Sequence, residues 1–189
     1  MILEQAALAA VVLFPLSEVL LAISKRAGGD KATAKDRGSL AGLWIAISVA
    51  ISISISCRYY RPAHMALPAT ARLAATIALI AGGLAFRWWA IRTLGRFFTV
   101  DVAAHSDHRL VDRGPYRLVR HPSYTGLLIA FMGLGVYFSN WLSFAVLMIS
   151  ITAAFLLRIR VEEGVLSETL GADYKEYCAR TKRLIPFIF

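Results

Sequence analysis

Two groups of polar residues lie at the ends of apolar runs. Charged groups at such positions are energetically unfavourable in a membrane, so their presence suggests a function. The segment 120–126, Arg-His-Pro-Ser-Tyr-Thr-Gly, comes just where a long apolar run begins. Arg158 and Glu162 follow the end of the next apolar run and are four residues apart, which places them on one face of a helix. Ionisable groups at the end of a membrane span usually face a cavity or the interior of the helix bundle. The pattern therefore indicates binding or chemistry at a membrane surface.

His121-Pro122 has the form of a helix start, because proline suits the first turn of a helix. A helix N-terminus presents free N–H groups and a partial positive charge, which can bind a carboxylate or a phosphate. Arg117 and Arg120 would strengthen that field. The alternative interpretation is that His121 and Ser123 only end a loop.

Arg158 is suited to hold a substrate carboxylate through its forked guanidinium group, and Glu162 is suited to accept an ammonium group. The alternative is a simple ion pair whose side chains extend out of the membrane into the interface. Arg160 and Glu163 fall on other faces of the same helix, so they are weaker candidates for a role in binding or catalysis.

Composition places the chain among membrane proteins. Of its 189 residues, 58% are hydrophobic and the mean hydropathy is +0.60, whereas soluble domains are about 45–50% apolar. The net charge of +9 falls in short loops between apolar runs, which is a topology signal, so nucleic acid is not an expected partner. The two cysteines, Cys57 and Cys178, are far apart and form neither a zinc pattern nor a disulfide framework.

We predict an all-α integral membrane protein of about five transmembrane helices. The main alternative is four spans, with the first two apolar runs short of crossing the membrane. The predicted spans are residues 2–24, 39–57, 69–89, 122–138 and 141–157. The alternation of Ile and Ser over 51–55 would suggest a strand, but an open strand leaves its backbone polar groups unpaired in lipid. Ser139-Asn140 is a very short link, so the last two spans should form an antiparallel hairpin.

The whole chain, 1–189, is expected to be a single membrane domain. Residues 1–93 would hold three spans, and residues 94–189 would form the catalytic half, with a loop, the helical hairpin and a C-terminal tail. The tail should continue as a helix and then lie as an amphipathic piece on the membrane surface.

Charge predicts the orientation of the chain in the membrane. Eighteen of the 21 Lys and Arg residues lie in the segments 25–37, 87–120 and 158–189. With five spans these three segments share one side, and the positive-inside rule makes that side cytoplasmic. The N-terminus would then lie outside, and the C-terminal, cofactor-binding region would lie in the cytoplasm.

The loop 95–120 contains Asp101, His105, Asp107 and His108, which raises the question of a metal site. No pair of these residues has a tight zinc spacing and no cysteine is near, so we expect no metal. The chain also lacks a dinucleotide-binding glycine motif, a P-loop and a serine nucleophile elbow.

From about residue 101 to 189 the chain resembles the isoprenylcysteine carboxyl methyltransferase family, whereas the first three spans match it in hydrophobicity alone. The resemblance rests on an ordered set of motifs: His-Arg-Leu-Val at 108–111, Gly-Pro-Tyr at 114–116, the segment 120–126, Arg158 with Glu162-Glu163, Tyr-Lys-Glu-Tyr at 174–177 and the closing Leu-Ile-Pro-Phe-Ile from 184. Membrane methyltransferases of phospholipids and some sterol reductases carry versions of the 120–126 piece.

The resemblance implies a methyl transfer from S-adenosylmethionine, with S-adenosylhomocysteine as product, to the C-terminal carboxylate of a prenylated cysteine or a similar lipophilic acid at the cytoplasmic membrane face. It implies that Glu162 holds the ammonium group of the donor and that Arg158 is the catalytic residue that meets the substrate carboxylate. The other implied cofactor-binding residues are Asp101, His108, Arg109, Leu110, Val111, Tyr116, His121, Pro122, Ser123 and Tyr124.

Three alternatives stay open from the sequence. The first is a methyltransferase that acts on the amine of phosphatidylethanolamine-type lipids, which would have less use for Arg158. The second is a reductase with a nicotinamide cofactor, for which 189 residues is short. The third is a membrane scaffold without catalysis. Membrane lipids are expected partners in each case, and the sequence leaves the oligomeric state open.

Overall fold

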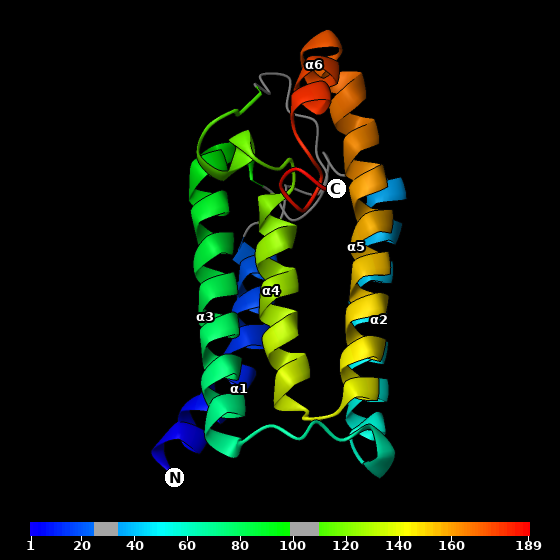
Figure 1. Ribbon diagram of the computed structural model, residues 1–189. Helices are drawn as coiled ribbons and strands as arrows, with labels where there is room; N and C mark the ends of the chain where they lie inside the picture. The colour runs from blue at the N-terminus through cyan, green and yellow to red at the C-terminus, as the bar shows by residue number, and fades with distance from the viewer. Residues whose placement is uncertain (25–33, 99–109) are drawn as a thin grey trace.

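The computed structural model describes residues 1–24, 34–98 and 110–189 and shows a bundle of long helices (Figure 1). The long elements are α1 (Ile2–Ser24), α2 (Ala34–Cys57), α3 (Ala69–Leu94), α4 (Pro122–Tyr137) and α5 (Trp141–Leu170). Short elements join them: the 3-10 helices η1 (Arg61–Ala63), η2 (Gly95–Phe97) and η3 (Gly114–Arg117), and the final helix α6 (Ala172–Arg180).

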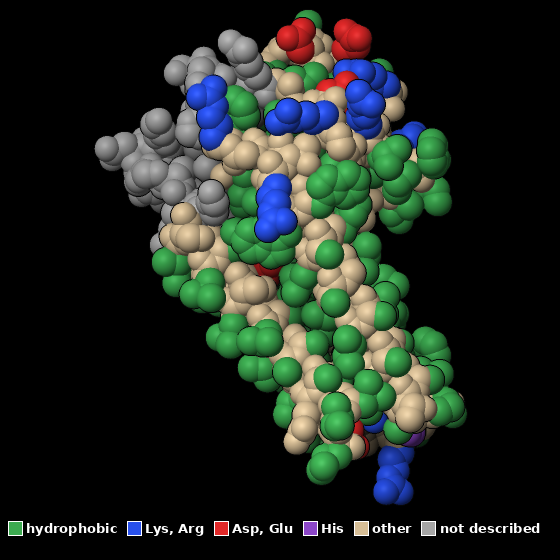
Figure 2. All heavy atoms as spheres, turned by 90° about the vertical axis from the view of Figure 1, so that its left-hand side faces the viewer, with side chains coloured by type: hydrophobic (Ala, Val, Ile, Leu, Met, Phe, Trp, Pro, Cys, Tyr) green, Lys and Arg blue, Asp and Glu red, His purple; other side chains and the backbone are tan. Residues whose placement is uncertain are grey.

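Four helices in the described part of the chain are long and apolar enough to cross a membrane: Ile2–Ser24, Gly38–Cys57, Ala69–Phe97 and Trp141–Leu170. The fifth predicted span is α4, which has 16 residues and is about 24 Å long at 1.5 Å per residue. That is less than the roughly 30 Å of hydrocarbon in a bilayer. Figure 2 shows hydrophobic side chains along the length of the bundle on the face it presents, with Lys and Arg gathered mainly at the α6 end. The protein is an all-helical integral membrane protein.

The Ile and Ser alternation of α2 is helical, and three serine hydroxyl groups of this helix bond back to its backbone. Ser48, Ser52 and Ser56 each donate a hydrogen bond to the carbonyl oxygen four residues earlier, at 2.8–3.2 Å. This pairing hides the hydroxyl groups from lipid, so alternating serines cost little in a membrane helix. Ser143 of α5 donates to the carbonyl oxygen of Ser54 at 2.7 Å and ties the two helices together.

The helices form two groups with the cavity between them. α3 packs along α4 and against α1, while α2 packs along α5. The α4–α5 hairpin joins the two groups at the end of the bundle away from α6 (Figure 1). At this turn the side chain of Asn140 accepts a hydrogen bond from the Ser143 amide at 3.1 Å and donates one to the carbonyl of Tyr60 at 2.8 Å. The predicted hairpin is therefore present, and Asn140 of its short link caps the N-terminus of α5.

α3 and α4 touch backbone to backbone through glycine. A methyl group added at Gly83 would lie 2.5 Å from the carbonyl oxygen of Gly126, and one added at Gly126 would lie 2.7 Å from the carbonyl oxygen of Gly83. Both contacts are too short for any side chain. Small residues permit this close approach, which is a common way to join helices in membranes.

We predict that Gly83→Ala lowers the stability of the protein by about 2 kcal/mol, because the added methyl group must push α3 away from α4. Gly82→Ala is the matched control, since a methyl group there has no atom within 4 Å. Thermal unfolding in detergent measures both. Equal midpoints for the two variants would show that the helices are not held this closely.

Candidate active site

The two helix groups enclose a cavity of about 570 Å³ that is polar at one end and apolar over the rest of its length. The apolar walls come from α1, α2, α4 and α5, and they are formed by residues such as Val11, Leu43, Ile47, Ile51, Leu127, Phe131, Leu134 and Phe155. Phe138, at the hairpin end of α4, also lines it. The cavity therefore runs along α4 for most of the length of that helix.

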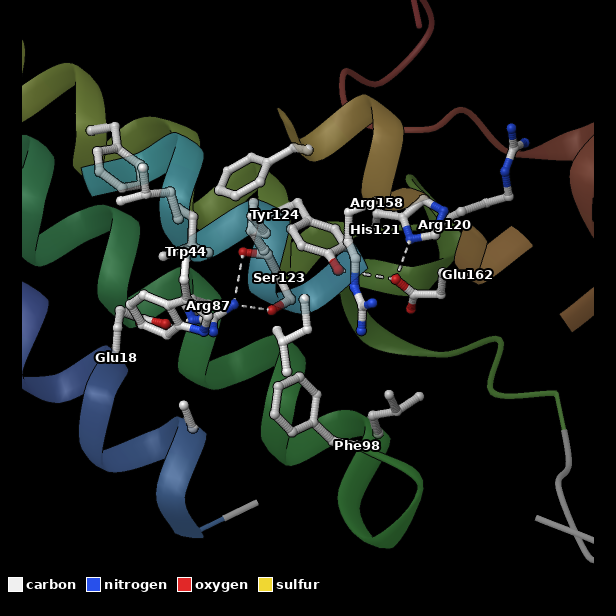
Figure 3. A pocket seen from close by; sticks show the side chains of 18 of the residues that line it. Glu18, Trp44, Arg87, Phe98, Arg120, His121, Ser123, Tyr124, Arg158 and Glu162 are labelled. Atoms are coloured by element: carbon white, nitrogen blue, oxygen red, sulfur yellow. Dashed lines mark hydrogen bonds and ion pairs between the residues drawn. The ribbon is translucent and has the colours of Figure 1, made fainter. Parts of the chain in front are cut away.

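At the polar end, α4 and α5 present facing polar side chains (Figure 3). The Tyr124 hydroxyl donates a hydrogen bond to Glu162 Oε2 at 3.1 Å, and His121 Nδ1 lies 3.9 Å from the same oxygen. Arg158, one helical turn before Glu162, is 2% exposed and lies beside the Tyr124 hydroxyl. The spacing of four residues in the sequence correctly predicted that Arg158 and Glu162 share a face, and that face lines the cavity.

Glu163 holds the chain segments around this polar end in place. It accepts hydrogen bonds from Arg120 Nε at 3.1 Å and from Arg183 Nη2 at 2.8 Å, and it lies 3.3 Å from His121 Nε2. The helical spacing predicted a smaller role for Glu163, because Glu163 lies on a different face of α5 from Glu162. That face is covered by the returning C-terminal segment, which the pattern of the helix alone could not reveal.

The C-terminal segment is fixed to the start of α4 through the backbone. The Arg120 and His121 amides donate to the carbonyl oxygens of Lys182 and Arg183 at 2.7 and 3.0 Å. Thr125 donates from its hydroxyl group to the carbonyl oxygen of Leu184 at 2.8 Å. Leu184, the first residue of the closing apolar segment, is buried.

A second buried ion pair crosses the cavity wall and was not predicted. Arg87 of α3 donates from Nε and Nη2 to the two carboxylate oxygens of Glu18 in α1, at 2.8 and 2.6 Å, and its Nη1 donates to the Ser123 hydroxyl at the start of α4. Both side chains are mostly buried and all three residues line the cavity. The sequence carried one signal, a charged residue within each of two apolar runs, but it could not show that the two residues meet.

η3 and α6 cover the polar end from the side of the loop. The Tyr177 hydroxyl donates to the carbonyl oxygen of Tyr116 at 2.7 Å, and Arg180 forms an ion pair with Asp112 at 2.7 Å. Burial raises the pKa of the Tyr116 and Tyr177 hydroxyl groups, so both stay neutral. Tyr174, one turn before Tyr177, also lines the cavity.

The structure brings most of the predicted site residues together. Those that line the cavity are Leu110, Val111, Tyr116, His121, Ser123, Tyr124, Arg158 and Glu162. Pro122 is buried at the first position of α4, next to the cavity wall but not in it. Asp101, His108 and Arg109 lie outside the described residues.

Comparison with known proteins identifies the family. The family model for isoprenylcysteine carboxyl methyltransferases matches residues 75–168. Over 187 residues the chain is 31% identical to protein-S-isoprenylcysteine O-methyltransferase B of Arabidopsis thaliana, and the alignment covers 95% of this chain and 90% of the relative. The chain belongs to the isoprenylcysteine carboxyl methyltransferase family. The resemblance found in residues 101–189 is confirmed, and the relation extends into the first three spans.

Two further relatives match less of their own length. The protein-S-isoprenylcysteine O-methyltransferase of Saccharomyces cerevisiae is 39% identical over 101 residues, which are 52% of this chain and 42% of the yeast protein. The solved structure of the eukaryotic intramembrane Ras methyltransferase of this family superposes with a TM-score of 0.59 at 28% identity. That match covers 77% of this chain and 52% of the other, so the present chain spans about half the length of that relative.

We predict that Glu18→Gln lowers stability by about 3–5 kcal/mol, because it leaves the buried Arg87 guanidinium without its carboxylate. The double variant Glu18→Leu with Arg87→Met removes both charges, so its loss of stability should be much smaller. Thermal unfolding in detergent compares the two. If the double variant unfolds as early as Glu18→Gln, loss of packing rather than an unpaired charge explains the effect.

Proposed function

We propose that the protein transfers a methyl group from S-adenosylmethionine to the carboxylate of a prenylated cysteine or a similar lipophilic acid. One observation carries this proposal: a single cavity joins a buried arginine and a glutamate to an apolar lining that extends to Phe138. An acid with a long hydrocarbon tail matches both parts, since the carboxylate fits the guanidinium group and the tail fits the apolar wall. The names of the relatives support the same substrate class.

The residues at the polar end fit the methyl donor. The Glu162 carboxylate faces the cavity and suits an ammonium group, and the start of α4, which carries the partial positive charge of a helix N-terminus, lies at the same end of the cavity. We propose Glu162, Tyr124, His121, Ser123, Tyr116, Leu110 and Val111 as donor-binding residues, with Pro122 setting the first turn of α4. Asp101, His108 and Arg109 remain proposals that rest on the family motif.

The proposed reaction needs little acid–base chemistry from the protein. When bound, S-adenosylmethionine supplies a methyl group activated by a positive sulfonium. A carboxylic acid is already ionised at pH 7, so no general base is required to make the nucleophile. The opposite charges of the two reactants are neutralised as the methyl group transfers. A cavity that excludes water stabilises the charged reactants less than bulk water does, whereas the less charged transition state loses little, so the barrier is lower. The protein then contributes mainly alignment of the two reactants.

Arg158 has the role of orienting the acid. Its side chain is buried and its backbone lies in the rigid middle of α5, so a carboxylate bound to its guanidinium group is held in a fixed position. The orientation of the protein in the membrane is part of the proposal: the N-terminus outside and the α6 end in the cytoplasm. The distribution of Lys and Arg supports it.

We expect Glu162→Ala to weaken binding of S-adenosylhomocysteine by tenfold or more, because the ammonium group of the ligand loses its counter-ion. Glu168→Ala is the control, since Glu168 is an exposed glutamate on the same helix. Isothermal titration calorimetry in detergent gives both affinities. Unchanged affinity in Glu162→Ala would contradict the role proposed for this residue. The absence of binding to the wild-type protein would contradict the proposed function.

Arg158→Ala should abolish most turnover of a farnesylated cysteine acid while S-adenosylhomocysteine affinity stays within about threefold of wild type, since the arginine serves the acid rather than the donor. Arg160→Ala, on an exposed face of α5, is the control and should keep its activity. The assay uses labelled methyl donor with the farnesylated cysteine acid and, in parallel, with phosphatidylethanolamine. Faster labelling of phosphatidylethanolamine would favour the amine methyltransferase instead.

A further inference from the structure

Two tyrosines on α6 are alike in burial but differ in what their hydroxyl groups bind. Tyr174 and Tyr177 are one turn apart and each is 3% exposed. The Tyr177 hydroxyl donates to the carbonyl oxygen of Tyr116 at 2.7 Å. The Tyr174 hydroxyl has no hydrogen-bond partner in the described part of the chain, although its oxygen is buried. Tyr174 also lines the cavity.

A buried hydroxyl group without a partner is unfavourable, and in native proteins such groups are rare and call for a specific explanation. Packing alone does not explain the hydroxyl, because phenylalanine would fill the same space without the unpaired oxygen. Burial, together with the negative charges of Glu163 and Glu162, raises the pKa of Tyr174, so the hydroxyl keeps its proton and can donate it. A hydrogen-bond acceptor supplied by a ligand in the cavity would satisfy it.

The surroundings of Tyr174 select which part of a ligand it would meet. Glu162 supplies negative charge at this end of the cavity and is assigned above to an ammonium group. Arg120, which also lines the cavity, supplies positive charge near Tyr174. An amino-acid head group carries an ammonium and a carboxylate on one carbon atom. A neutral hydroxyl donor close to both a glutamate and an arginine matches the carboxylate of such a group.

We propose that Tyr174 is a further cofactor-binding residue, whose hydroxyl group donates a hydrogen bond to the carboxylate of the methionine part of the methyl donor. The inference rests on the proposed function and extends its site onto α6. It also gives the tyrosine pair two separate roles: Tyr177 fastens α6 to η3, and Tyr174 uses that fixed position to reach the ligand.

The test compares two ligands against three proteins by calorimetry in detergent. The ligands are S-adenosylhomocysteine and its decarboxylated analogue, which keeps the amine but lacks the carboxylate. The proteins are wild type, Tyr174→Phe and Tyr177→Phe. In Tyr174→Phe we expect S-adenosylhomocysteine to bind about tenfold more weakly, with the analogue changed less than about twofold, because only the first ligand has the acceptor.

Thermal unfolding without ligand separates binding from folding. Tyr174→Phe should unfold at the wild-type temperature or above it, since it removes an unpaired buried oxygen. Tyr177→Phe should unfold at a lower temperature, because it leaves the Tyr116 carbonyl without its donor, yet it should keep the wild-type ratio of the two affinities.

Three outcomes overturn the inference. If Tyr174→Phe loses the same affinity for both ligands, the carboxylate is not the hydrogen-bond acceptor. If it loses affinity for neither ligand, Tyr174 makes no contact with the methyl donor. A lower unfolding temperature for Tyr174→Phe without ligand would assign the hydroxyl to the fold. If the wild-type protein binds neither ligand, the proposed function is contradicted as well. If the wild-type protein binds both ligands and Tyr174→Phe leaves the ratio of the two affinities unchanged, only the role of Tyr174 is contradicted.

Discussion

The requirement that buried charges be paired determines how this bundle is assembled. A lone charge inside a membrane is expensive, so a carboxylate there needs a cation within reach. Glu18 satisfies this with Arg87, which is 69 residues away, and Glu163 satisfies it with Arg120 and Arg183. Each pair joins segments that are distant in the sequence. The first sets α1 against α3 and the start of α4, and the second brings the C-terminal segment back over α5. Both contacts lie at the polar end of the cavity.

The short length of α4 bears on the depth at which the polar end of the cavity would lie in a membrane. The hairpin end carries the exposed aromatic residues Tyr59, Tyr60 and Trp141, which suit the interface region. Measured from that end, α4 is about 6 Å shorter than the hydrocarbon layer. If the hairpin end lies at one interface, this difference in length would leave His121 and Tyr124 within the depth of the bilayer. The backbone groups before α4 remain satisfied because the C-terminal segment accepts their hydrogen bonds, as protein must do where water is absent.

The sequence predicted the parts of this structure that depend on local patterns. Long apolar runs with short basic loops predicted the helices, and the lipid environment correctly overruled the strand-like alternation of α2. The spacing of Arg158 and Glu162 predicted their common face, because four residues make about one turn of helix. The contacts of Glu18 with Arg87, the anchoring role of Glu163 and the buried Tyr174 hydroxyl could not be predicted, because each depends on which distant segment lies opposite. The division into one membrane domain and the orientation of the termini remain predictions.

In the proposed reaction α5 would also set how far apart the two reactants are held. Arg158 and Glu162 belong to one continuous helix of 30 residues, so their backbone positions are separated by four residues, or about 6 Å along the axis. If one residue holds the acid and the other holds the ammonium group of the donor, that rise sets the register between the two ligands without help from a moving loop. The register is rigid because α5 is fixed on two sides, by α2 through Ser143 and by the C-terminal segment through Glu163. Alignment of two reactants can supply a large part of the rate enhancement of an enzyme, and in the proposed reaction it would depend on the geometry of one helix.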